Sequence, residues 1–178
     1  MRPPVVASIV LASGLVAGGA VAQTPTRSCV RVEVSSASPS APLSRSALVP
    51  SVPSFSATRI LDLTFTVLFP TTLEGEHVAE LRVFTPDAQL YRSLAMPFAR
   101  GAQPNAARPV EGYARPVPQQ PLKQVSRGSG LFAAASTTFP VGGTDIVSSG
   151  LYGRWRVEAY LDGAEQRCAP AASFTLNP

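Results

Sequence analysis

The densest group of titratable side chains in the sequence lies between positions 74 and 80, where Glu74, Glu76, His77 and Glu80 are found. His77 is the only histidine of the chain, so a serine–histidine–aspartate mechanism would have to use it as the base. Together with Glu76 and Glu80, its imidazole could also offer nitrogen and oxygen ligands to a metal ion. The alternative is a polar turn that leads into the strand expected at 78–85.

The sequence lacks the motifs that would turn this cluster into a hydrolase site. No Gly-x-Ser-x-Gly nucleophile elbow occurs, and Gly128-Ser129-Gly130 falls within a proline-rich segment. We therefore expect no enzyme, no catalytic residue, no metal site and no cofactor. A metal-dependent or His77-based hydrolase is the less favoured hypothesis.

Cys29 and Cys168 lie near the two ends of the chain, and no Cys-x-x-Cys redox motif is present. In an oxidising compartment an even pair of cysteines is expected to form a disulfide. Strand alternation predicts that Cys168 faces the core, whereas Cys29 shares a strand face with Arg31 and Glu33. Either Cys29 precedes the regular strand pairing, or the bridge forms at a bulge or an edge.

Positive charge is concentrated between residues 100 and 130, where Glu111 is the only acid. The basic residues of this segment form a candidate contact surface: Arg100, Arg108, Arg115, Lys123 and Arg127. Such a surface would suit an acidic polymer or an anionic membrane face, and the alternative is a solvated loop. Nucleic acid is not an expected partner, because that role needs clustered basic residues interleaved with aromatic side chains on one face.

Aromatic side chains on a surface could bind sugars by stacking. Alternation predicts outward positions for Tyr91 and Tyr160, and Tyr113 lies in the basic segment. Trp155 would be the best platform, but its predicted position is inward. A carbohydrate-binding module is therefore the alternative function, with a polysaccharide as the alternative partner.

Four segments alternate between apolar and polar residues, which is the period of a half-buried strand. The residues expected to face inward are Leu61, Leu63, Phe65, Val67 and Phe69; Ala79, Leu81 and Val83; Leu90, Leu94, Met96 and Phe98; and Trp155, Val157, Ala159 and Leu161. Thr85-Pro86-Asp87-Ala88 supplies a turn between the second and third of these segments. A further strand is expected at 28–35, with Val30, Val32 and Val34 on one face.

Asp162-Gly163 predicts a two-residue hairpin turn after the last of these strands. The resulting register pairs Glu158 with Arg167 on the outer face and Val157 with Cys168 on the inner face. The inner face would continue through Ala172, Phe174 and Leu176, with an interruption of the ladder at Pro170.

The remaining segments give weaker signals. Residues 131–148 are expected to hold one or two short strands around Phe132, Phe139 and Val141, with a turn at Gly142-Gly143. Residues 35–56 and 99–130 are rich in proline and are predicted to be extended or disordered loops. No segment outside the leader has sustained helical periodicity, so no helix is expected.

The C-terminal motifs support a fold class. The run from Gly150 to Gly163, followed by Ala172-Ser-Phe-Thr-Leu176, resembles the last hairpin of bacterial immunoglobulin-like or fibronectin-type-III-like modules. Tyr152 occupies the place where such folds carry a tyrosine corner, although the immunoglobulin Cys…Trp…Cys spacing is absent. The resemblance and the strand content predict an all-β, two-sheet antiparallel immunoglobulin-like sandwich of about seven strands with two long proline-rich loops. The resemblance implies no chemistry, because this architecture hosts many functions.

Residues 1–22 have the layout of a secretory signal peptide: a positive start at Arg2, an uncharged apolar run, and Ala20-Val21-Ala22 before the cleavage point. A membrane anchor is the alternative, but an apolar run of about 17 residues is marginal for a bilayer span. We expect a single β-sandwich domain at 23–178, secreted or periplasmic, with no stable membrane span after cleavage. The predicted function is a non-catalytic binding or structural module whose partner is another protein of the cell envelope or extracellular space.

Overall fold

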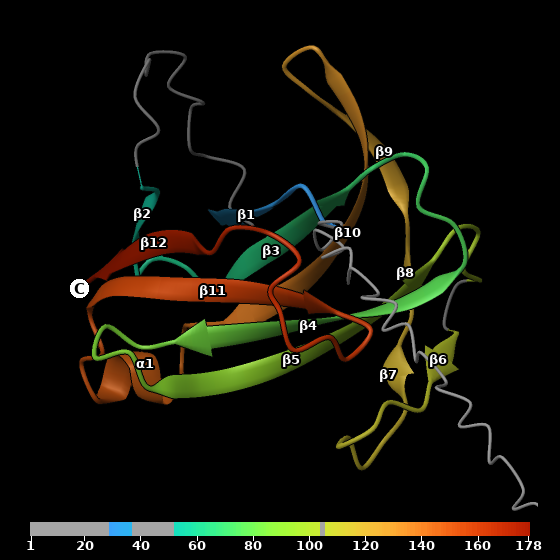
Figure 1. Ribbon diagram of the computed structural model, residues 1–178. Helices are drawn as coiled ribbons and strands as arrows, with labels where there is room; N and C mark the ends of the chain where they lie inside the picture. Colours follow the sequence, from blue (N-terminus) through green and yellow to red (C-terminus); the bar gives the residue numbers. More distant parts are fainter. Residues whose placement is uncertain (1–28, 37–51, 104–105) are drawn as a thin grey trace, which may run out of the picture.

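The computed structural model describes residues 29–36, 52–103 and 106–178, and it is an all-β structure with one short helix (Figure 1). The leader predicted at 1–22 lies outside the described residues, as does most of the loop predicted at 35–56. Within the described part of the chain, no helix has the length and apolar character needed to cross a membrane.

The strands form two main sheets and one small one. In sheet order, sheet A contains β1 (Arg31–Ser36), β3 (Asp62–Phe69), β10 (Gly130–Pro140) and β9 (Lys123–Arg127). Sheet B contains β2 (Ser54–Ser56), β12 (Ala172–Asn177), β11 (Gly153–Leu161), β4 (Glu76–Phe84), β5 (Leu90–Ala99) and β8 (Gln120–Pro121). The small sheet pairs β6 (Ala107–Arg108) with β7 (Val117–Pro118), and the helix is α1 (Asp145–Ser148).

Aromatic side chains from the two main sheets meet in one core. Phe65 of β3 lies 5.8 Å from Phe174 of β12, and Trp155 of β11 lies 6.1 Å from Phe139 of β10, measured between ring centroids. The predicted alternation is confirmed at most inward positions, which are almost fully buried: Leu63, Phe65, Val67, Phe69, Ala79, Leu81, Val83, Met96, Phe98, Trp155, Val157 and Ala159. The apolar faces that the sequence predicts are thus the faces that make the core.

Two inward predictions are wrong for a local reason each. Leu61 is 77% exposed because it precedes β3. Leu90 is 56% exposed because a β-bulge shifts the register between β4 and β5: Val83 pairs with Arg92, and Phe84 pairs with Leu90. The unpaired extra residue, Tyr91, therefore changes its face. An extra residue in one strand has this effect because side chains alternate with period two.

The hairpin after β11 has the predicted turn and a different register. Asp162 and Gly163 both have positive φ, at 51° and 73°, and Leu161 O accepts a hydrogen bond from Ala164 N at 3.0 Å. The chain then detours, so Val157 pairs with Ala172 instead of Cys168. The predicted partners Glu158 and Arg167 still form an ion pair at 3.2 Å, because the loop carries Arg167 back over the outer face.

The predicted disulfide between Cys29 and Cys168 is confirmed, with a Cα–Cα distance of 5.0 Å. Cys29 lies before the first residue of β1, and its N–H donates to Cys168 O at 3.3 Å. Both cysteines are buried. The first of the two expected geometries is therefore the correct one: the bridge forms where regular pairing has not yet begun.

The proline-rich segment 99–130 is more ordered than predicted, because it contributes β6, β7, β8 and β9. Likewise β2 lies at the end of segment 35–56, where it pairs in parallel with β12. Residues 131–140 belong to one long strand, β10, and α1 follows the predicted Gly142-Gly143 turn. The expectation of no helix is wrong. α1 has four residues, capped by Thr144, whose side chain accepts from Ile146 N, and one turn is too short to give a periodic signal.

Candidate functional site

The imidazole of His77 lies at the start of β4, and both of its nitrogens face oxygen atoms. Nδ1 lies 2.7 Å from Oδ2 of Asp162, and Nε2 lies 2.8 Å from the carbonyl oxygen of Glu74. The other carboxylate oxygen of Asp162 accepts from Val78 N at 2.9 Å. Only the doubly protonated imidazolium can donate to both oxygen partners at once.

Partial burial by itself lowers the pKa of His77. The hydrogen bonds to the Asp162 carboxylate and to the Glu74 carbonyl, with the charge of Asp162, outweigh burial and a repulsion from Arg108, so the pKa is raised above its ordinary value. The protonated His77 side chain therefore links the chain at Glu74 to the turn at Asp162. Both of its nitrogens are used in these two contacts. The sequence reasoning missed Asp162 as the partner, because Asp162-Gly163 reads first as turn chemistry.

The glutamates near His77 have other partners than a metal. Glu80 accepts two hydrogen bonds from Arg82, at 2.9 and 3.1 Å, and this pairing holds the pKa of Glu80 below its ordinary value. Glu76 lies 3.5 Å from Nη1 of Arg108, a buried nitrogen that has no hydrogen bond. Among the described residues, no group of three or more His, Cys, Asp or Glu side chains is arranged to hold a metal ion.

Two of the three tyrosines considered as a sugar platform, Tyr91 and Tyr160, do not lie on an open surface. Tyr91 packs edge-on against Trp155 with ring centroids 5.3 Å apart, so its predicted outward position is wrong. Tyr160 does lie on the outer face of sheet B, but it is only 8% exposed, beneath the guanidinium of Arg82 at 4.2 Å. Tyr113 is exposed, and its hydroxyl donates to Ser93 O at 3.1 Å.

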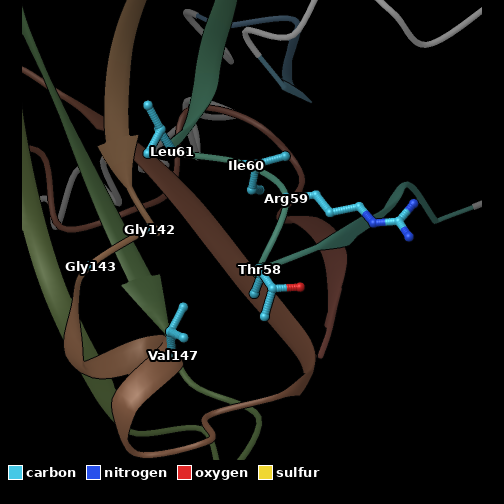
Figure 2. Close-up of a pocket in the computed structure, with 8 residues that line it drawn as sticks. Thr58, Arg59, Ile60, Leu61, Gly142, Gly143 and Val147 are labelled. Atoms are coloured by element: carbon cyan, nitrogen blue, oxygen red, sulfur yellow. The ribbon is translucent and has the colours of Figure 1, made fainter.

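A pocket of about 350 Å³ lies at the end of the molecule where α1 follows β10 (Figure 2). Its walls are the segment 57–61, the Gly142-Gly143 turn and Val147. A side chain at Gly142 would come within 2.9 Å of Ile60 O, so glycine permits this close approach. The lining is mainly apolar, and Figure 2 shows the one charged side chain, Arg59, extending away from the glycine turn. Arg59 is therefore the one titratable side chain among the residues that line this pocket.

Three of the five residues of the predicted contact surface lie between β5 and β7. Arg100 donates to the carbonyl oxygens of Thr71 and Leu73, and Arg108 approaches Glu76 as described above. Arg115 is exposed. The first two arginines therefore hold the β3–β4 connection and its neighbourhood together.

The other two residues, Lys123 and Arg127, lie on β9, at one edge of sheet A. Figure 1 shows β9 and β10 extending as a hairpin beyond the body of the molecule. Arg127 donates through Nε to Glu33 of β1 at 2.9 Å, although β3 and β10 lie between these strands in the sheet. The hairpin must therefore curl over the outer face of sheet A.

No protein-family model matches the chain, and no curated protein matches it.

Proposed function

We propose that the fold is immunoglobulin-like. Immunoglobulin domains order their strands A-B-E-D in one sheet and G-F-C, extended by C′, in the other. Sheet A has the order β1-β3-β10-β9, and the longer strands of sheet B have the order β12-β11-β4-β5. With β1 as strand A and β12 as strand G, the letters follow the chain from A to G without a break, and this agreement supports the proposal.

The connection between β10 and β11 gives independent support. Tyr152, just before β11, donates from its hydroxyl to Val147 O, five residues upstream, at 3.4 Å. A tyrosine at the start of strand F that bonds back to the backbone of the preceding connection is the tyrosine corner of these sandwiches. Trp155 on the same strand anchors the core and donates to Leu151 O.

We propose further that the protein is exported and works as a non-catalytic module that binds another protein. The leader expected at 1–22 and the Cys29–Cys168 disulfide support export, because disulfides persist in oxidising compartments. The binding proposal is carried by one observation: two basic residues of the segment singled out from its charge, Lys123 and Arg127, lie on an edge strand. A basic edge favours an added strand whose opposing residues are acidic.

The hairpin turn defines which backbone groups of β9 face the open edge. Gly128 has a φ of +60°, and Arg127 pairs directly with Gly130 across a two-residue turn. Pairs that flank such a turn are hydrogen-bonded, and bonded pairs alternate with unbonded ones along an antiparallel ladder. The N–H and C=O groups of Gln124 and Ser126 therefore point away from β10. The Ser126 carbonyl oxygen accepts from Nη1 of Arg127 at 3.1 Å, which leaves the Ser126 N–H and the two groups of Gln124 for an incoming strand.

A peptide that alternates glutamate with valine is the direct probe of this proposal. Addition of the peptide to the exported chain should slow amide hydrogen exchange at Gln124 and Ser126, whereas a peptide that alternates lysine with valine should not. Gln124→Pro should abolish the effect, because proline removes an outward N–H while the bonds to β10 remain. Val125→Pro is the structural control. It should lower the melting temperature, because proline removes the Val125 N–H that bonds to β10. Undiminished peptide binding by folded Gln124→Pro protein would contradict the proposal.

A further inference from the structure

A groove of about 170 Å³ lies beside β9 on the outer face of sheet A. Register defines this face: Thr66 pairs with Ser136 and Lys123 with Ala134, while their neighbours Phe65 and Val67 face the core. Its lining includes Thr66 of β3, Gln120 of β8, Lys123 and Arg127 of β9, and Ser136 of β10. Residues from four strands thus converge on one small concave site.

The charge of this face is positive even after its internal ion pairs are formed. This face carries three described basic residues, Arg31, Lys123 and Arg127, and two described acids, Glu33 and Asp62 at the far end of β3. The Glu33 carboxylate accepts from Arg31 at 2.6 Å and from Arg127 at 2.9 Å. Lys123 is exposed and has no acidic partner within 4 Å among the described residues. The ammonium group of Lys123 therefore supplies a positive charge that the fold does not neutralise.

Hydroxyl and amide groups complete the groove. The hydroxyl oxygens of Thr66 and Ser136 lie 2.8 Å apart, so one donates to the other and the second hydroxyl has a proton left for another acceptor. Gln120 adds a side-chain amide to the same lining. The lysine ammonium, the free hydroxyl and the amide N–H can all donate to the same carboxylate. Hydrogen bonds to an ionised carboxylate are stronger than those between neutral groups, so this set of donors suits a carboxylate ligand.

We infer that this groove is a carboxylate-binding site that receives an acidic side chain of the protein partner. The inference depends on the proposed strand addition at β9 for the source of the carboxylate, but the groove itself can be tested without a strand. The volume suits one carboxylate group and its stem, and Glu33 between its two arginines shows how readily this face holds a carboxylate. The groove would then select the position of an acidic residue within an added strand, while β9 supplies the backbone pairing.

The small probe for this site is N-acetylglutamate, with N-acetylglutamine as its uncharged match. Titrated into the exported chain and followed by amide NMR, N-acetylglutamate should shift Thr66, Lys123 and Ser136, and N-acetylglutamine should not. Lys123→Gln should weaken the affinity at least tenfold, and Ser136→Ala should weaken it less. Arg154→Gln removes an equal charge from an exposed position on β11 and should leave the affinity unchanged.

Equal affinities of wild-type, Lys123→Gln and Arg154→Gln proteins for N-acetylglutamate would overturn the inference. Tighter binding of inorganic sulfate than of N-acetylglutamate at the same residues would also overturn it, because it would indicate a sulfated polysaccharide as the ligand. These results would leave the exchange protection of Gln124 and Ser126 by the acidic peptide intact, so failure of the groove and failure of strand addition are distinguishable.

Discussion

His77 and Asp162 are 85 positions apart in the chain, and their side chains meet at 2.7 Å between Nδ1 and Oδ2. The pair joins the start of β4 to the turn after β11, and its hydrogen bonds require the charged imidazole. The folded-state pKa of His77 lies above the unfolded value of about 6.5. The stabilisation is therefore fully present below about pH 6.5 and is lost as the pH rises through the folded-state pKa.

Urea unfolding of the wild-type protein, from about pH 5 to about pH 9, should show this loss as a falling free energy of unfolding. Asp162→Asn should flatten that part of the profile. Asparagine keeps an oxygen for Val78 N and tolerates the positive φ at this turn, so the variant should remain folded. Identical pH profiles for the two proteins would show that the pair does not raise the pKa of His77.

Removal of the disulfide should destabilise the protein more than any single surface change. Cys29 and Cys168 enclose a loop with a sequence separation of 139. Chain-entropy arguments and measured deletions give a loss of about 2–5 kcal/mol for such a bridge. The double variant Cys29→Ser, Cys168→Ser should therefore melt at a lower temperature than the oxidised protein. The melting temperature of the wild type should also fall in reducing agent, whereas that of the double variant should not change.

Glu158→Gln should be costly because this carboxylate is nearly buried. It is 8% exposed and accepts from the Tyr160 hydroxyl at 2.8 Å, with Arg167 at 3.2 Å and Arg156 at 3.4 Å. Weakening these charge-assisted bonds should lower the free energy of unfolding by about 1–3 kcal/mol. Glu80→Gln is the matched control: its pair with Arg82 is more exposed and should contribute less than about 1 kcal/mol. Both free energies of unfolding can be measured by chemical denaturation. Equal losses in the two variants would contradict the greater contribution expected from the buried Glu158 carboxylate.

Tyr152→Phe isolates the hydrogen bond of the proposed tyrosine corner from the packing of the ring. Loss of the bond to Val147 O should lower stability by about 0.5–1.5 kcal/mol. The ring and its contacts remain, so the far-ultraviolet spectrum should not change. Tyr113→Phe, which removes an exposed bond to Ser93 O, provides the comparison. A larger loss of unfolding free energy from Tyr113→Phe than from Tyr152→Phe would contradict the structural role of the Tyr152 hydrogen bond.

The alternation of apolar residues was enough to predict the core strands, because burial on one face demands period two. It could not predict the face on which the Tyr91 side chain lies. A bulge depends on the partner strand β4 as much as on β5, and its single extra residue reverses the face of everything before it. The bulge leaves Leu90 exposed and packs the Tyr91 ring against Trp155, so this ring is not available on the outer face for stacking on a sugar.

The turn at Asp162-Gly163 illustrates a second limit. Two residues define the turn, but the pairing beyond it depends on where Cys168 must lie to reach Cys29. The Cys168 N–H bonds to Ala159 O, and pairing resumes at Ala172, after Pro170. The candidate site residues could likewise be predicted only in part, because the sequence does not give the order of the strands in the sheet. Lys123 and Arg127 were identifiable from charge, whereas Thr66, Ser136 and Glu33 join them only because sheet order brings distant strands together.

The position of the disulfide also determines how the chain would respond to a mechanical load. Because Cys29 precedes β1 and is bonded to Cys168, tension between a point before Cys29 and the C-terminal residue passes through the sulfur–sulfur bond. The 139-position loop between the cysteines is bypassed and cannot be extended. Of the described residues, only those after Cys168, chiefly β12, can be drawn out. A module built this way would yield by peeling one strand, and the rest of its core would be shielded from the pull.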